Sequence, residues 1–66
     1  MQYILTIHAN ERMDKCGITF DQVVTAIQRG AKTKQTDGFL VVYTYIRVAY
    51  AIRGEKCIIK TVMIQD

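Results

Sequence analysis

Residues 8–30, HANERMDKCGITFDQVVTAIQRG, decide the fold because they predict two short helices joined by a tight corner at Gly17. His8 and Arg12 are four residues apart, so on a helix they lie on one face, one turn from each other. A second face carries small and apolar side chains at helical spacing: Ala9, Met13 and Cys16. The first helix is therefore expected to bury one face and to present charge on another.

The second helix has the clearest local signals. Thr19 and Gln22 have the spacing of a capping box, in which each side chain satisfies a free backbone N–H group of the first turn. Hydrophobic residues then recur at helical spacing on one face: Phe20, Val23, Val24 and Ile27. Gly30 is expected to end this helix in the left-handed conformation that glycine adopts without strain.

Strands are expected on both sides of the helix pair. Residues 3–7 are rich in β-branched and aromatic side chains, and residues 31–36 alternate lysines with small or hydroxyl side chains, as exposed edge strands do. Asp37 and Gly38 form a strong two-residue hairpin signal. Residues 39–53 contain no glycine or proline but are too many for one strand, so the chain is expected to reverse near residues 44–46.

The second part of that long segment alternates between two faces. One set is expected to be buried, namely Val48, Tyr50 and Ile52, and the other to lie on the open side, namely Arg47, Ala49, Ala51 and Arg53. Gly54 and Glu55 predict a second hairpin. Residues 56–64 then return as a final strand, and their density of Ile, Val and Met indicates a central position in the sheet.

The order of elements is thus β-α-α-β-β-β(-β). Because the helices come as a pair and do not alternate with strands, the fold class is α+β. We expect a single domain over residues 1–66, with one curved antiparallel sheet and two helices packed on one face.

Size and composition limit the possible partners. A domain of 66 residues buries only about 60% of its unfolded surface and is marginally stable alone. Since 50% of the residues are hydrophobic, some apolar surface is expected to meet another chain, either a second copy in a homodimer or a different protein. The formal net charge of +3 is compatible with a polyanionic partner such as RNA but is not specific to one.

The two cysteines, Cys16 and Cys57, are expected to be free thiols on apolar surfaces. A disulfide between them is the alternative that the sequence leaves open. Together with His8 they offer too few ligands for a structural zinc site, so we expect no metal and no cofactor. We recognise no secretory signal and no apolar segment long enough to span a membrane. A cytoplasmic location without membrane contact is therefore expected.

Several short motifs together resemble a known family. They are His-Ala-x-x-Arg-Met at residues 8–13, Gly-Ile-Thr at residues 17–19, the glycine at position 30, and Thr-Val at residues 61–62. In this order they resemble a group of small bacterial, archaeal and mobile-element proteins known as a domain of unknown function. That group lies in the RelE/ParE-like toxin superfamily, which shares its fold with barnase-like and colicin-type ribonucleases. Residues 45–50 are also similar to the Tyr-Arg-Val-x-Tyr strand of RelE-like toxins, with Ile46 as an additional residue.

The resemblance implies a toxin-like endoribonuclease that is neutralised by an antitoxin protein and binds RNA on the concave face of its sheet. Such enzymes use the ribose 2′-hydroxyl as nucleophile, which requires a base and cations around the phosphate. Histidine exchanges protons readily near neutral pH, and the planar fork of arginine matches a phosphate. The expected catalytic residues are His8, Arg12 and Arg47. Further RNA contacts are expected from Lys32, Lys34, Tyr43, Tyr45, Arg53 and Lys60.

Each of these residues also has a structural explanation. His8 could cap the first helix, Arg12 could pair with Asp14 or Glu55, and exposed lysines are ordinary on a small domain. One histidine without a nearby carboxylate is also a small set for a nuclease. The sequence therefore leaves an alternative open, in which the same fold is a non-catalytic module that binds nucleic acid or protein.

Overall fold

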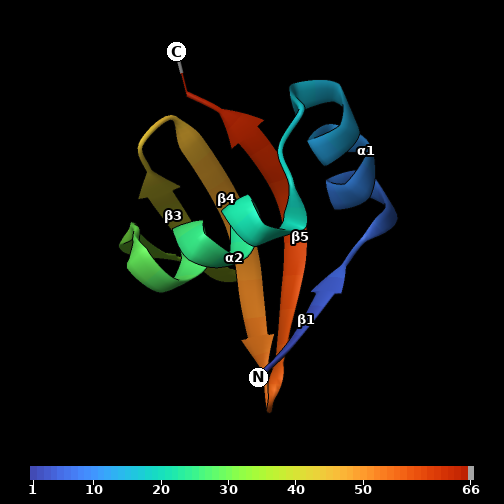
Figure 1. Ribbon diagram of the computed structural model, residues 1–66. Helices are drawn as coiled ribbons and strands as arrows, with labels where there is room; N and C mark the ends of the chain where they lie inside the picture. The colour runs from blue at the N-terminus through green and yellow to red at the C-terminus, as the bar shows by residue number, and fades with distance from the viewer. Residues whose placement is uncertain (66) are drawn as a thin grey trace.

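The computed structural model describes residues 1–65 and shows two helices packed against one five-stranded sheet (Figure 1). The elements are β1 (Gln2–Leu5), α1 (Ile7–Cys16), α2 (Phe20–Arg29), β2 (Ala31–Gln35), β3 (Gly38–Tyr43), β4 (Ile46–Arg53) and β5 (Lys56–Ile64). The α+β class, the single sheet and the order β-α-α-β-β-β-β confirm the expectation from the sequence. Neither of the described helices is long and apolar enough to cross a membrane.

The strands lie side by side in the order β1-β5-β4-β3-β2, so β5 is an interior strand between β1 and β4, whereas the middle position belongs to β4. The three pairs that join β2, β3, β4 and β5 are antiparallel, because tight hairpins connect these strands. In contrast, β1 runs parallel to β5. The expected wholly antiparallel sheet is therefore corrected to a mixed one, since no hairpin fixes the direction of β1 and the two helices carry the chain to the opposite edge.

Local signals set both ends of α1. The Thr6 hydroxyl accepts a hydrogen bond from the Ala9 N–H, which makes Thr6 the N-cap. The first strand therefore ends at Leu5, and the expected strand over residues 3–7 was too long. Gly17, at φ 68°, ends the helix in the left-handed conformation, as the predicted corner requires.

The capping box of α2 is confirmed, because Thr19 and Gln22 exchange side-chain and backbone hydrogen bonds. The predicted left-handed stop at Gly30 is wrong, since its backbone is extended at φ −75°. Glycine is needed there for another reason. A Cβ atom would lie 2.5 Å from Cγ2 of Val41 and 2.6 Å from the carbonyl oxygen of Ala26. The end of α2 therefore passes too close to β3 for any side chain.

Two of the three hairpin turns fall where the sequence predicts them. Thr44 and Tyr45 form the loop between β3 and β4, with Thr44 at a positive φ of 55°, and Gly54 and Glu55 connect β4 to β5. The remaining loop lies one residue earlier than expected, at Thr36 and Asp37, because Gly38 already pairs with Gln35. A Cβ atom on Gly38 would lie 2.3 Å from the carbonyl oxygen of Tyr50, so this glycine allows the turn to approach β4.

One hydrophobic cluster fills the space between the helices and the sheet. Its buried members are Ala9, Met13, Ile18, Val23, Ala26, Ile27, Val41, Ile46, Val48, Tyr50, Cys57, Ile59 and Val62. In Figure 1, α2 crosses in front of β3 and β4, and α1 lies beside the upper half of β5. Phe20 departs from its expected buried position, since it is 42% exposed and meets Tyr3 edge-on. Cys16 and Cys57 are free thiols.

Candidate nucleic-acid interface

The side of the sheet away from the helices carries apolar and cationic side chains together. Val41 and Val48 are buried beneath the helices, so their neighbours in β3 and β4 point to the opposite side. We call this side the open face, formed by Leu40, Val42, Arg47, Ala49, Ala51, Arg53, Lys56, Ile58, Lys60, Thr61 and Met63. Ala51 is buried although the sequence placed it on the open side, Arg53 and Lys56 are exposed, and the other residues are half-buried.

Arg47 lies within the apolar part of the open face. Its neighbours on the adjacent strands are Val42 in β3 and Met63 in β5. The Nε atom of Arg47 is buried and makes no hydrogen bond to any described residue. A buried donor without an acceptor costs free energy, and a charged donor costs more than a neutral one.

A β-bulge in β5 shapes the same face. Ala49 pairs with Thr61 but Tyr50 pairs with Ile59, so Lys60 is an extra residue without a partner on β4. The bulge allows Lys60 and Thr61 to lie on the same side of the strand, while Ile59 remains in the core. No turn residue or glycine near Lys60 announces this irregularity in the sequence.

Helix α1 covers the outer edge of β5 where β1 stops. The last residue pair between β1 and β5 is Leu5 with Ile59. Beyond it, the Thr6 hydroxyl lies 3.0 and 3.1 Å from the carbonyl oxygens of Ile59 and Lys60, to which it can donate. Arg12 Nε donates to the Val62 carbonyl oxygen at 3.4 Å. These side chains satisfy strand carbonyls that no neighbouring strand reaches.

Arg12 and Arg47 therefore approach adjacent residues of β5 from opposite sides. Arg12 contacts Val62 from the outer edge, whereas Arg47 is the β4 partner of Met63. His8 lies one turn before Arg12 on the same side of α1, and its side chain is exposed. Arg12 and Arg47 thus lie along one segment of β5, and the exposed His8 lies one helical turn from Arg12. No pairing of Arg12 with Asp14 or Glu55 occurs among the described residues.

The expected RNA-binding residues are divided between the two faces. Lys32 and Lys34 pair with Val41 and Phe39, so their side chains point to the helix side of the edge strand. Both lysines are exposed. By contrast, Arg53 and Lys60 lie on the open face with Arg47. The alternation of residues in β4 predicts the side of Arg53, whereas the sides of Lys32 and Lys34 depend on a register that the sequence did not specify.

Asp37 joins the open face through ion pairs, although the sequence indicated only a turn at this residue and no role in the site. Arg53 Nη2 lies 2.9 Å from its Oδ1 atom, and Lys60 Nζ lies 3.1 Å from its Oδ2 atom. The hydrogen bond from Lys60, followed by that from Arg53, lowers the pKa of Asp37 below its ordinary value. The carboxylate is therefore fully charged at neutral pH. Asp37 lies near β4 because its neighbour Gly38 packs closely against the backbone of that strand. Only the tertiary structure reveals this contact.

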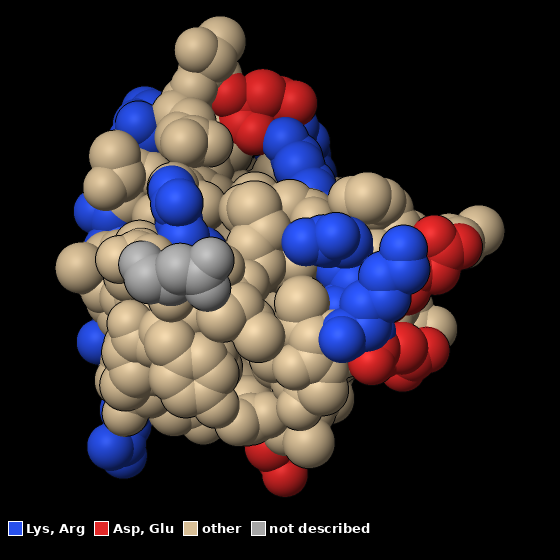
Figure 2. Space-filling view, turned by 90° about the horizontal axis from the view of Figure 1, so that it is seen from above, with Lys and Arg blue, Asp and Glu red and all other residues tan. Residues whose placement is uncertain are grey.

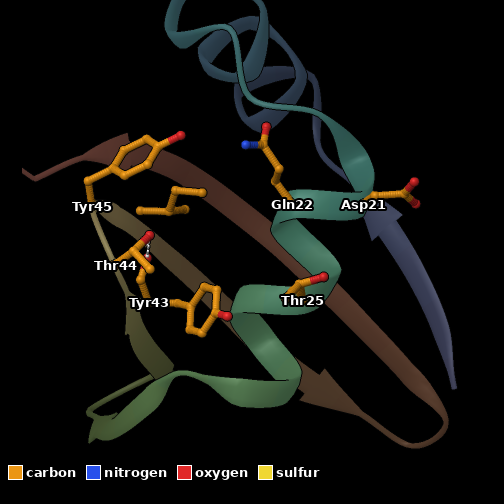
Figure 3. A pocket seen from close by; sticks show the side chains of 7 residues that line it. Asp21, Gln22, Thr25, Tyr43, Thr44 and Tyr45 are labelled. Atoms are coloured by element: carbon orange, nitrogen blue, oxygen red, sulfur yellow. Dashed lines mark hydrogen bonds between the residues drawn. The ribbon is translucent and has the colours of Figure 1, made fainter.

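Tyr43 and Tyr45 line a pocket of about 210 Å³ between α2 and the β3–β4 turn (Figure 3). The other lining residues are Asp21, Gln22, Thr25, Thr44 and Ile46. Figure 3 shows the Gln22 side chain extending from α2 toward Tyr45, whereas the Asp21 carboxylate points away from the pocket. Because Tyr43 pairs with the buried Ile46, the pocket lies on the helix side of the sheet. The two tyrosines are therefore separated from Arg47.

Basic side chains are dispersed over the molecule. At the end seen in Figure 2, blue side chains form separate groups, the largest of which lies beside red ones, and most of the surface is tan. Within residues 1–65, no three His, Cys, Asp or Glu side chains come together in a way that could hold a metal ion. The candidate site consequently depends on a few placed cations and not on a continuous basic patch.

Comparison with known proteins adds no further assignment. No family model, no curated protein and no solved structure matches this chain. A function has to be argued from the geometry of the open face and of α1.

Proposed function

We propose that this chain is a toxin-like, metal-independent endoribonuclease that binds RNA across the open face and cleaves it beside His8, Arg12 and Arg47. One observation carries the proposal: the Arg12 guanidinium donates to the Val62 carbonyl oxygen, and Arg47 in β4 is the strand partner of Met63, the next residue of β5. Arginines on both sides of one strand suit an RNA backbone, because each guanidinium can offer planar N–H donors to phosphate oxygens.

Arg47 is the phosphate ligand in this proposal. Val42 and Met63 reduce its access to water, and its buried Nε lacks an acceptor. A charge-assisted hydrogen bond from this guanidinium to a phosphate oxygen would be strong where apolar neighbours keep water away. Arg12 has a double role, since it supports the edge of β5 through the Val62 carbonyl and adds positive charge near the same phosphate.

His8 is the general base in this proposal. Its exposed imidazole accepts the proton of a ribose 2′-hydroxyl, and O2′ forms a bond to phosphorus. The bond from phosphorus to O5′ then breaks, and O5′ takes a proton from water. The products are a 2′,3′-cyclic phosphate and a 5′-hydroxyl end. Positive charge at Arg12 and Arg47 stabilises the charge that develops on the phosphate oxygens.

The apolar residues of the open face support a protein partner as well as RNA. Leu40, Val42, Ile58 and Met63 are only half-buried on a face without helices. An antitoxin protein that covers them would block access to Arg47 and so neutralise the chain. A second copy of the chain in a homodimer would compete with RNA in the same way.

The test is cleavage of end-labelled RNA by the purified chain in the presence of EDTA. We expect products with cyclic phosphate ends and no cleavage of RNA whose riboses are 2′-O-methylated. His8→Ala should lower the rate by at least about 100-fold. Its thermal unfolding midpoint should not change, because the His8 side chain is exposed and makes none of the hydrogen bonds found among the described side chains.

Arg47→Gln should also lose cleavage and should bind RNA more weakly than the wild type. The proposal fails if His8→Ala cleaves at the wild-type rate or if cleavage requires a divalent ion. Salt-sensitive RNA binding without any product would instead support the alternative, a non-catalytic binding module on the same face.

A further inference from the structure

Three charged side chains form a compact cluster at one end of the open face. Arg53 comes from β4, Lys60 from β5, and Asp37 from the loop that joins β2 to β3. Each carboxylate oxygen of Asp37 accepts from a different cation, with distances of 2.9 Å to Arg53 Nη2 and 3.1 Å to Lys60 Nζ. Lys60 also donates to the backbone carbonyl of Asp37. One carboxylate therefore bridges cations on two neighbouring strands.

The backbone places these groups through two irregular features. The bulge in β5 gives Lys60 no partner on β4, which leaves its side chain directed across the open face. Gly38 lets the β2–β3 loop approach the Tyr50 carbonyl more closely than any residue with a Cβ atom could. Both cations reach the same carboxylate, so they would face the same space if Asp37 were turned away. Neither cation has another acidic partner among residues 1–65.

The ion pairs are exposed to water, which makes them easy to exchange. The side chains of Asp37, Arg53 and Lys60 are 71%, 56% and 38% exposed. Ion pairs at such exposure contribute little to stability because water and salt screen them. A competing anion with oxygen acceptors can consequently replace the carboxylate at small cost.

We propose that Arg53 and Lys60 form a phosphate subsite on the open face, which Asp37 occupies in the free chain and leaves when a phosphate of the RNA backbone binds. This inference rests on the proposed function, since the phosphate belongs to the same RNA that reaches Arg47. Arg47 and Arg53 lie on the same side of one strand, so a bound strand can contact both. Asp37 lowers the affinity for RNA, because the phosphate that binds at this subsite must first displace it.

The experiment measures binding of a fluorescent 2′-O-methyl oligoribonucleotide, which the proposed chemistry cannot cleave. Asp37→Asn should bind about three- to tenfold tighter than the wild type, as expected for removal of exposed competing ion pairs. The slope of log Kd against log salt should change by less than about 0.7, the value of one phosphate contact on a single strand, because the same phosphate contacts form in both complexes. Asparagine before glycine retains the preference for this turn, so the loop should be preserved.

Two controls separate the subsite from a general effect of charge. Asp21→Asn removes the same charge from α2 on the opposite side of the sheet and should change Kd by less than about twofold. In a Lys60→Gln background, Asp37→Asn should give a smaller gain than in the wild type, because one of the two cations is missing. Equal gains from Asp37→Asn and Asp21→Asn would overturn the subsite, as would unchanged or weaker binding by Asp37→Asn.

This result is independent of the cleavage test. If the wild-type chain cleaves RNA but Asp37→Asn binds no tighter, the subsite is wrong and the proposed function remains. If Asp37→Asn binds tighter but the chain never cleaves unmodified RNA, the subsite is supported and the nuclease proposal is wrong.

Discussion

Gly30 is the residue at which a single added methyl group is expected to disturb the fold most directly. Its Cβ atom would lie 2.5 Å from Val41 Cγ2, 2.6 Å from the Ala26 carbonyl oxygen and 2.7 Å from the Val42 carbonyl oxygen. Since two of these atoms belong to the backbone, the end of α2 and strand β3 would have to separate. Gly30→Ala should therefore lower the free energy of unfolding by about 1–3 kcal/mol, measured by urea denaturation.

Gly17 provides the matched control for this prediction. It has a left-handed φ of 68°, and a Cβ atom there would meet nothing within 4 Å. Gly17→Asn should cost less than about 1 kcal/mol, because asparagine tolerates this conformation better than other residues with a side chain. If Gly30→Ala unfolds at the same urea concentration as the wild type, the proposed close approach is not rigid.

At the level of elements, the Thr6 hydroxyl connects α1 to the sheet. It accepts from the Ala9 N–H at 3.1 Å and lies 3.0 Å from the Ile59 carbonyl oxygen, to which it donates. Thr6→Val removes both bonds and should destabilise the fold by about 2 kcal/mol. Thr19→Val removes a cap on α2 without a strand contact and should cost only about 1 kcal/mol.

Thermal and urea unfolding of both variants would test whether Thr6→Val loses more stability than Thr19→Val. Thr6→Ser retains the hydroxyl and should stay close to the wild type. An equal loss for Thr6→Val and Thr19→Val would show that the bond to the β5 edge contributes no stability.

For the whole molecule, the affinity for RNA should depend more on the side of the sheet on which a cation lies than on the number of cations. Lys32 and Lys34 point to the helix side of the sheet, whereas Arg47 and Arg53 lie on the open face. Removal of two charges in Arg47→Gln/Arg53→Gln should weaken binding of single-stranded RNA by at least about tenfold and lower the salt slope by about 1.4. Lys32→Gln/Lys34→Gln removes the same charge but should weaken binding by less than about threefold.

Fluorescence anisotropy at several salt concentrations would measure both effects. Equal losses for the two double variants would mean that RNA responds only to net charge, and the open face would then have no special role.

The fold could be predicted largely because its helices carry their own start and stop signals. Thr19 and Gln22 are three residues apart, and their hydrogen bonds form within one turn of α2. The reversal at Thr44 was located only from strand length, since this residue is not a typical one for a positive φ. Gly30 was predicted to lie at the helix end for the wrong reason, because its constraint comes from β3 and not from its own backbone angles.

The candidate site was predicted less completely than the fold. Alternation along β4 was sufficient to place Arg47 and Arg53 on one face. It could not show that Arg47 Nε is buried without an acceptor, that Lys60 occupies a bulge, or that Asp37 bridges two cations. These features depend on which residues of different strands come to lie opposite each other.

The sequence by itself determined the α+β class, both helices and most of the strands, because caps, turns and hydrophobic periodicity act between residues a few positions apart. Only the tertiary structure decided the parallel pairing of β1 with β5, the face on which each cation lies, and the placement of Arg12 and Arg47 beside consecutive residues of β5. Such pairings join residues up to 54 positions apart, as Thr6 and Lys60 do, and they follow from the packing of the whole sheet.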